Sequence, residues 1–153
     1  TKKEVQTSWE LIKLKEQKFK ASNHPISDTL KKKIRSQPPI SGALEISKKA
    51  ASLGFDWEHI DDIWKKVEEE LEELKEEIHK KNMSHAQEEL GDVIFTLINI
   101  ARRLEISAEE GLAGTNKRFL DRFSYIESTV KGDFSKQSLD KLQTIWKSAK
   151  KIF

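Results

Sequence analysis

Residues 66–101 read KVEEELEELKEEIHKKNMSHAQEELGDVIFTLINIA and contain two helical patterns separated by a short polar break. In both patterns apolar residues recur at intervals of three and four, the period of one face of an α-helix. The first helix is predicted over 58–80, with apolar positions 60, 63, 64, 67, 71, 74 and 78. The second is predicted to run to 104, with apolar positions 90, 93, 94, 97, 98, 101 and 104. Because a short connection makes helices antiparallel neighbours, the stretch predicts a helical hairpin.

Each of these helices carries two acids three residues apart, Glu70 with Glu73 and Glu89 with Asp92. Residues with this spacing share a helix face, so the packed hairpin can present four carboxylates to one point. Oxygen ligands of this kind are those that Mg²⁺ prefers. A glutamate-rich run alone is usually a solvated helix face. Gly91 next to Asp92 favours a site instead, because a helical glycine costs about 1 kcal/mol relative to alanine and indicates a close approach.

Three further motifs accompany the acid pairs: GFDW at 54–57, TNKRFLDRFSYIE at 115–127, and Trp146 followed by Lys150. In this order the motifs resemble the MazG family of nucleoside triphosphate pyrophosphohydrolases, over about Pro38 to Lys150. The resemblance implies an all-α helical bundle of the all-α NTP pyrophosphatase type, completed by dimerisation. It also implies hydrolysis of NTPs or dNTPs to the monophosphate and pyrophosphate, a house-cleaning role in the nucleotide pool, and a cytoplasmic homodimer.

The resemblance also assigns roles to individual residues. Its metal ligands correspond to Glu70, Glu73, Glu89 and Asp92, with Mg²⁺, or alternatively Mn²⁺, as the cofactor. A nearby carboxylate, Glu69 or Glu88, would accept the proton of the attacking water, and the sequence does not choose between them. The residues expected to bind the substrate are Asn116, Arg118, Arg122, Trp146 and Lys150, of which the last two form a clamp.

This sequence departs from the family's pattern at a few positions. Arg118 stands where the family has a lysine, which keeps the charge. His85 stands where some relatives have a lysine, and Gly42 where many have an arginine. These differences concern substrate choice or affinity more than the chemistry. Besides Asn99 and Asn116 no amide pair is evident that would read a base, so the sequence predicts a broad range of triphosphates.

Two other functions remain open from the residues themselves. A non-catalytic helical assembly module explains the periodicity equally well but gives no reason for Gly91 and Asp92. A dUTPase-like enzyme would share the acid pairs but select pyrimidines, and TNKRF with Trp146 favours MazG over it. The arginines have a simpler interpretation too, since Arg118 and Arg122 can pair with Asp121 or Glu127 on the surface.

Composition excludes several classes of protein. The 153 residues include no cysteine, so disulfides and thiolate metal sites are excluded. No apolar run approaches the length of a membrane span, and no interaction with a membrane is expected. Charged residues make up 35% of the chain but the net charge is only +2. Nucleic-acid binding is not expected, because no basic face stands without acids.

The chain is predicted to have two parts, 1–40 and 41–153. The first comprises a helix over 1–21 and a proline-containing connector over 22–41, and the second is the MazG-like domain. Within the second part, a helix over 41–53 is predicted to end at Gly54. Side-chain caps are predicted at the starts of the later helices, by Asp56, by Ser84 with Gln87, by Ser107, and by Ser135 or Ser138.

Overall fold

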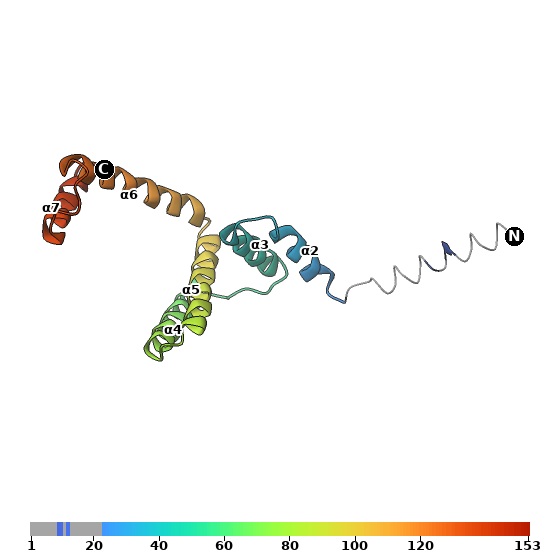
Figure 1. Cartoon of the computed structure of the whole chain (residues 1–153). Helices are drawn as coiled ribbons and strands as arrows, with labels where there is room; N and C mark the ends of the chain where they lie inside the picture. The colour runs from blue at the N-terminus through green and yellow to red at the C-terminus, as the bar shows by residue number, and fades with distance from the viewer. Residues whose placement is uncertain (1–8, 11, 13–22) are drawn as a thin grey trace. The chain divides into compact units, whose positions relative to one another are not determined.

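The computed structural model describes residues 9, 10, 12 and 23–153, and within them every regular element is a helix (Figure 1). The prediction of an all-α fold is confirmed. The helices are α2 (Pro25–Ile34), α3 (Pro39–Ser52), α4 (Ile60–His79), α5 (Met83–Arg103), α6 (Ala108–Thr129) and α7 (Leu139–Ala149). Of the helix predicted over 1–21, only Trp9, Glu10 and Ile12 are among the described residues, and these are helical. No described helix combines the length and the apolar character needed to cross a bilayer.

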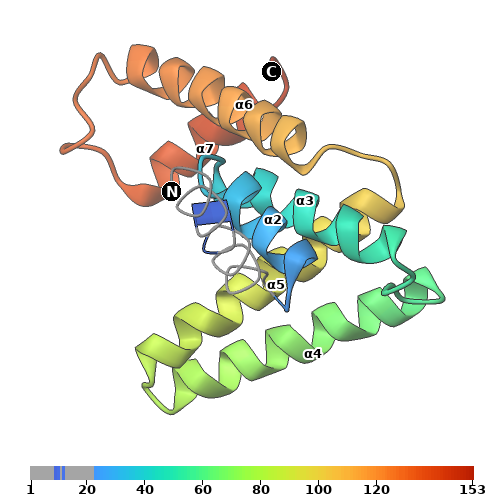
Figure 2. The ribbon, with the colours of Figure 1, turned by 90° about the vertical axis from the view of Figure 1, so that its right-hand side faces the viewer.

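The chain forms two compact units, Thr1–Glu58 and His59–Phe153. In the first unit α2 packs against α3. The second unit contains two helix pairs, α4 with α5 and α6 with α7 (Figures 1 and 2). The boundary between the units falls within the part predicted as 41–153.

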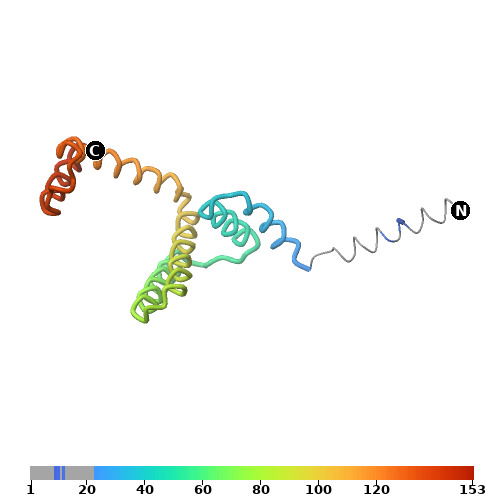
Figure 3. The backbone as a smooth tube through the Cα atoms, viewed as in Figure 1, coloured from blue at the N-terminus to red at the C-terminus, as the bar shows by residue number. Residues whose placement is uncertain are grey.

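The α4–α5 pair is the predicted helical hairpin, and its chain reversal lies at Lys80–Asn82 (Figure 3). Its core is built from the predicted apolar positions: Ile63 is fully buried, and Val67, Val93, Ile98 and Ala101 are buried with it. Three other apolar positions, Leu90, Ile94 and Leu97, remain more than 40% exposed. Since one helix can cover only one side of another, α5 keeps an apolar stripe that α4 does not bury.

The predicted connector over 22–41 is wrong in one respect, because half of it is the helix α2. Pro25 is the first residue of this helix, where proline is tolerated because the N–H it lacks has no partner in the first turn. Pro39 likewise begins α3, with Pro38 as the residue before it. The prolines therefore start helices here instead of interrupting them.

Two of the predicted helix caps are wrong and three are confirmed. The side chain of Asn82, not Ser84, accepts from the backbone N–H of His85 at the start of α5. Asp56 bonds its neighbour Trp57, and α4 begins after His59 without a side-chain cap. The cap residues confirmed by their geometry are Ser107, Ser138 and Gly54, the last with a φ of 85°.

Candidate active site

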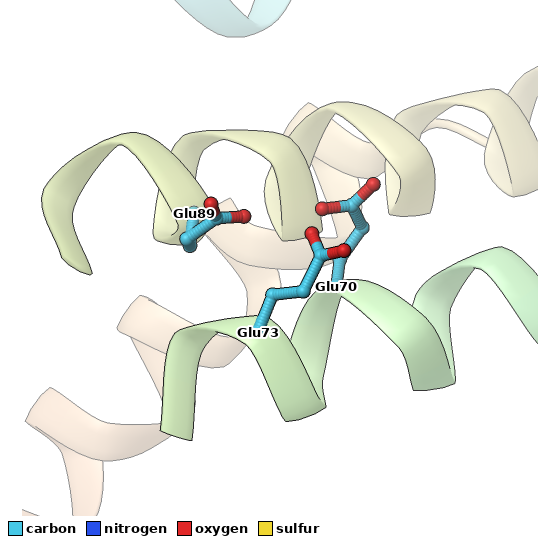
Figure 4. Close-up of side chains that lie close together, drawn as sticks. All are labelled: Glu70, Glu73 and Glu89. Carbon is cyan, nitrogen blue, oxygen red and sulfur yellow. The ribbon is translucent and has the colours of Figure 1, made fainter. Parts of the chain in front are cut away.

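Three carboxylates converge between α4 and α5. Glu70 and Glu73 project from α4 and Glu89 from α5 (Figure 4), and one oxygen from each lies within 4.8 Å of the others. The spacing of three places the first two on one face of α4, and the hairpin brings α5 against that face. Glu70 is buried, with an exposed fraction of 5%, while the other two are half-buried.

Lys66 neutralises part of this negative charge. Its Nζ lies 2.6 Å from Oε1 of Glu70, one helical turn away, and 3.3 Å from Oε2 of Glu69. The hydrogen bond with Glu70 raises the pKa of Lys66, so the ammonium is held in its charged form. Lys66 was not predicted from the sequence to be part of the site. Its position four residues before Glu70 is the signal that would have found it.

The charged form of Glu73 is disfavoured in the cluster, whereas the charged form of Lys66 is favoured. Hydrogen bonding with Glu70 raises the pKa of Glu73, and partial burial and the charges of Glu70 and Glu89 act in the same direction. Like charges at this distance disfavour ionisation of Glu73. The cluster is therefore electrostatically strained at neutral pH unless a cation joins it.

The residues present fit a divalent cation. Oε2 of Glu89 is buried and has no hydrogen-bond partner among the described residues, which costs free energy unless another group compensates. Three carboxylates against the single ammonium of Lys66 leave an excess of negative charge. Carboxylate oxygens are the ligands that hard cations such as Mg²⁺ select, with water or phosphate oxygens completing the shell.

Asp92, the fourth predicted ligand, does not join this group of three. It is exposed on α5, and its backbone carbonyl accepts a hydrogen bond of 2.8 Å from the hydroxyl of Thr96. The expected close approach at Gly91 is also absent within the described chain, because a Cβ built on this residue would meet no atom within 4 Å. Neither residue therefore has a packing role in the hairpin.

Gly91→Ala separates packing from function. We expect it to raise the free energy of unfolding by roughly 1 kcal/mol, since alanine is the better helix former and the space beside residue 91 is open. We also expect Gly91→Ala to lower catalytic activity. The added methyl group would occupy the open space beside residue 91, where we expect a substrate or a second chain to approach. Urea denaturation and turnover are the measurements. Gly111→Ala is the matched control, since it is also helical and open. Equal activity of the two variants would contradict a functional role for Gly91.

The predicted phosphate-binding side chains lie in the other helix pair. Arg118 and Arg122 are one turn apart on α6, and neither forms an ion pair with an acid among the described residues. Arg118 donates to the hydroxyl of Thr115 at 3.1 Å. The acid Asp121 is paired with Lys117 at 2.7 Å. The pairing of these arginines with Asp121 or Glu127 is therefore not seen.

Arg122 on α6 contacts both Phe153 and Trp146. Its Nε and Nη2 donate to the backbone carbonyl of Phe153 at 3.3 and 2.9 Å. Its guanidinium carbon lies 5.6 Å from the ring centre of Trp146, within range of a cation–π interaction. Trp146 also contacts Phe119, with ring centres 5.2 Å apart. The structure thus brings two of the predicted substrate-binding residues together.

The remaining predicted residues are on the surface. Asn116, Lys150 and Glu88 are exposed. In the described part of the chain the predicted donors lie on the α6–α7 pair and the clustered acids on the α4–α5 pair.

Gly42 and His85, two of the departures from the family's pattern, each contact a neighbouring element of the structure. A Cβ on Gly42 would lie 3.4 Å from Cβ of Ile34, an ordinary van der Waals contact, so position 42 faces α2 where the two helices pack. His85 has its Nδ1 2.8 Å from the amide nitrogen of Asn82 and 3.7 Å from Oε2 of Glu77. That carboxylate oxygen is buried without a hydrogen bond among the described residues.

Comparison with known proteins places this geometry in a family. Residues 59–124, which contain the acid cluster and both α6 arginines, match the model of the MazG nucleotide pyrophosphohydrolase domain. A Thermotoga maritima protein named nucleoside triphosphate pyrophosphohydrolase/pyrophosphatase MazG is 34% identical over 116 residues, covering 74% of this chain and 44% of its own length.

A second relative is the nucleoside triphosphate pyrophosphohydrolase of Escherichia coli K12. It is 32% identical over 153 residues, covering 97% of this chain and 57% of its own length. The chain therefore spans about half the length of these two relatives. The matched domain, the all-helical fold and the convergent acids agree with one another, and residues 59–124 of this chain form a domain of the MazG nucleotide pyrophosphohydrolase family.

Proposed function

We propose that this protein is a Mg²⁺-dependent hydrolase that converts nucleoside triphosphates to the monophosphate and pyrophosphate. The observation that carries the proposal is the convergence of Glu70, Glu73 and Glu89, with one buried oxygen of Glu89 left without a donor. A helical module that served only assembly has no reason to gather three carboxylates between its core helices. The names of the relatives give the reaction class.

In this proposal the three clustered carboxylates hold Mg²⁺, and Asp92 becomes a further ligand from the next turn of α5. When bound, the ion supplies positive charge that polarises a phosphate and lowers the pKa of its water. Mn²⁺ would substitute, since it also accepts oxygen ligands. Lys66 orients Glu70 by its 2.6 Å contact and holds Glu69 beside the cluster. Glu69 is therefore the carboxylate that we assign as the proton acceptor.

The phosphates would be bound by the basic side chains of α6 and α7. Arg118 and Arg122 offer planar forks that match phosphate oxygens, and Lys150 a mobile point charge. Arg122 uses two of its N–H groups on Phe153. A guanidinium has five, so donors remain for a phosphate. Asn116, two residues before Arg118 on α6, would complete the set.

Product analysis tests the reaction. With Mg²⁺ the protein is expected to release pyrophosphate and a nucleoside monophosphate from ATP, GTP, CTP and UTP and from their deoxy forms. Removing the metal with EDTA should abolish release, and restoring Mg²⁺ or Mn²⁺ should recover it. Orthophosphate as the first product would indicate attack at the terminal phosphate and contradict the proposal. Hydrolysis of dUTP alone would favour the dUTPase-like alternative. No hydrolysis of any triphosphate would favour the assembly module.

We further propose that the active form is a homodimer. The side chains of Leu90, Ile94 and Leu97 follow one another at intervals of four and three along α5 and are 47%, 43% and 42% exposed. Such a stripe on a core helix is typical of an interface. Two-fold symmetry is the commonest arrangement of homo-oligomers, and a second copy would provide another α6–α7 pair near the acids.

Sedimentation checks the dimer. The wild-type protein is expected to sediment as a dimer, and Ile94→Asp as a monomer with reduced turnover, because a charge in an apolar interface is costly. Lys81→Glu, an exposed change in the turn before α5, is the control and should remain dimeric. A wild-type monomer with full activity would contradict both the dimer and a site shared between chains. Circular dichroism of the Ile94→Asp protein establishes that it is folded.

The cellular role that we propose is the removal of surplus or damaged triphosphates from the cytoplasmic nucleotide pool. This role follows from the proposed binding of the phosphates by basic side chains of α6 and α7, because all nucleotides share these phosphates. Competition between normal and modified triphosphates in the same assay tests it, and strict selection of one normal nucleotide would contradict it.

A further inference from the structure

Glu77 has a buried carboxylate oxygen that the proposed hydrolysis does not use. It lies on α4 one turn after Glu73, and only 17% of its side chain is exposed. Its Oε1 is 3.4 Å from Nζ of Lys80, which contacts Glu76 more closely at 2.8 Å. Its Oε2 is buried and accepts no hydrogen bond from the described residues. Because a buried oxygen without a partner costs free energy, a cation or a donor that reached Oε2 would stabilise the hairpin.

His85 lies opposite this oxygen, near the start of α5. Its Nδ1 is 3.7 Å from Oε2 of Glu77, which is too long for a hydrogen bond. The same Nδ1 is 2.8 Å from the amide nitrogen of Asn82. An amide nitrogen only donates, so Nδ1 is the acceptor of that contact and carries a lone pair. Two electron-pair donors from different helices therefore lie near each other without a proton between them.

The distance between these two atoms suits a shared metal ion. Zn²⁺ binds imidazole nitrogen and carboxylate oxygen at about 2.0–2.2 Å, so the two bonds add up to about 4.1 Å, and an ion slightly off the line between the atoms reaches both. A pair of one nitrogen and one oxygen favours a borderline cation such as Zn²⁺ over Mg²⁺, which selects oxygen ligands. Water would complete the shell, and a half-turn of the Asn82 amide would present its oxygen to the same ion.

We propose that Glu77 and His85 form a second metal site, for Zn²⁺, separate from the carboxylate cluster. The site would join the end of α4 to the start of α5 beside the chain reversal. Glu77 follows Glu73 by one turn and His85 precedes Glu89 by one turn. An ion here would therefore hold the two helices at the spacing that brings the clustered acids together. The site stands apart from the proposed hydrolysis, in which neither Glu77 nor His85 holds Mg²⁺ or accepts the proton.

Calorimetric titration with ZnCl₂ tests the site, with excess Mg²⁺ present to compete for the carboxylate cluster. The wild-type protein is expected to bind Zn²⁺, and Glu77→Gln and His85→Ala should each weaken this binding at least about ten-fold. Even the loss of a group that only orients a metal ligand lowers affinity about 10–100-fold. The matched controls are His79→Ala, another exposed histidine near the turn, and Glu72→Gln, an exposed acid paired with Lys75. Both should bind Zn²⁺ like the wild type.

Nitrogen NMR identifies the atom that binds. Zn²⁺ is expected to shift the Nδ1 resonance of His85 and to leave the other three of the chain's four histidines unchanged. It should also raise the Tm of the wild-type and His79→Ala proteins but not of His85→Ala, because an ion stabilises only the protein that binds it. His85 is 59% exposed, so the alanine variant should keep its helical circular dichroism.

Several results would overturn the proposal. Equal Zn²⁺ affinity of the wild-type and His85→Ala proteins would place the ion elsewhere, for example in the carboxylate cluster. A resonance shift at another histidine in place of His85, or no Zn²⁺ binding by the wild type, would do the same. If His85 serves only as the partner of Asn82, His85→Ala should lower the Tm equally with and without Zn²⁺. Pyrophosphate release with Mg²⁺ alone, measured separately on the wild type, decides the proposed function independently.

Discussion

Glu73→Gln is expected to lower the rate of pyrophosphate release at least about a thousand-fold. The side chain keeps its size but loses the charge that helps to hold the metal, and a bound metal contributes several kcal/mol to phosphate chemistry. Steady-state kinetics at saturating Mg²⁺ measure the effect. Glu72→Gln is the matched control, because Glu72 is the exposed neighbour paired with Lys75, and it should retain full activity. Wild-type turnover by the Glu73→Gln protein would remove this residue from the site.

The same substitution is expected to stabilise the metal-free protein at neutral pH. The pKa of Glu73 is raised in the folded state above the ordinary value of 4.5, so ionised Glu73 disfavours folding. This penalty is absent below pH 4.5 and develops as the pH rises through the folded-state pKa. Thermal unfolding in EDTA should therefore give a higher Tm for Glu73→Gln at pH 7, and a smaller difference at pH 4. With Mg²⁺ the order should reverse, since the metal stabilises only the protein that binds it.

Arg122→Ala is expected to lower kcat/KM for ATP by roughly ten- to a hundred-fold. Hydrogen bonds to a charged group contribute about 1.5–3 kcal/mol, and this guanidinium lies beside Trp146 with part of its fork free. Arg122→Lys should recover only part of the loss, because an ammonium keeps the charge but not the fork. Lys117→Ala, on the same helix and paired with Asp121, is the control.

A structural role for Arg122 makes a different prediction. If its purpose is to hold the chain end through Phe153, the alanine variant loses thermal stability while its KM for ATP and its affinity for tripolyphosphate stay at the values of the control. A stable Arg122→Ala protein with weakened binding of both ligands supports phosphate binding instead.

The helical hairpin and the face on which its acids lie follow from the order of the residues alone. The apolar period fixes which side of α4 is buried, and Ile63 and Val67 occupy that side as predicted. A spacing of three then places Glu70 and Glu73 together, because this relation is a property of one helix and needs no partner. The caps at Ser107 and Ser138 were predictable for the same reason, since each depends on a few neighbouring residues.

Which carboxylates meet depends on how α5 packs against α4 and could not be predicted from the order of the residues. Whether Glu89 or Asp92 faces Glu73 depends on the stagger of α5 against α4, which is set by the fit of their core side chains and by the turn at Asn82. The structure selects Glu89 and leaves Asp92 exposed. The stacking of Phe134 on Phe123 has the same origin. Phe134 follows Phe123 by eleven residues, and its ring reaches that helix only because the loop before α7 folds back on α6. Contacts within a helix follow from its period, whereas contacts between helices follow from packing, which no local pattern contains.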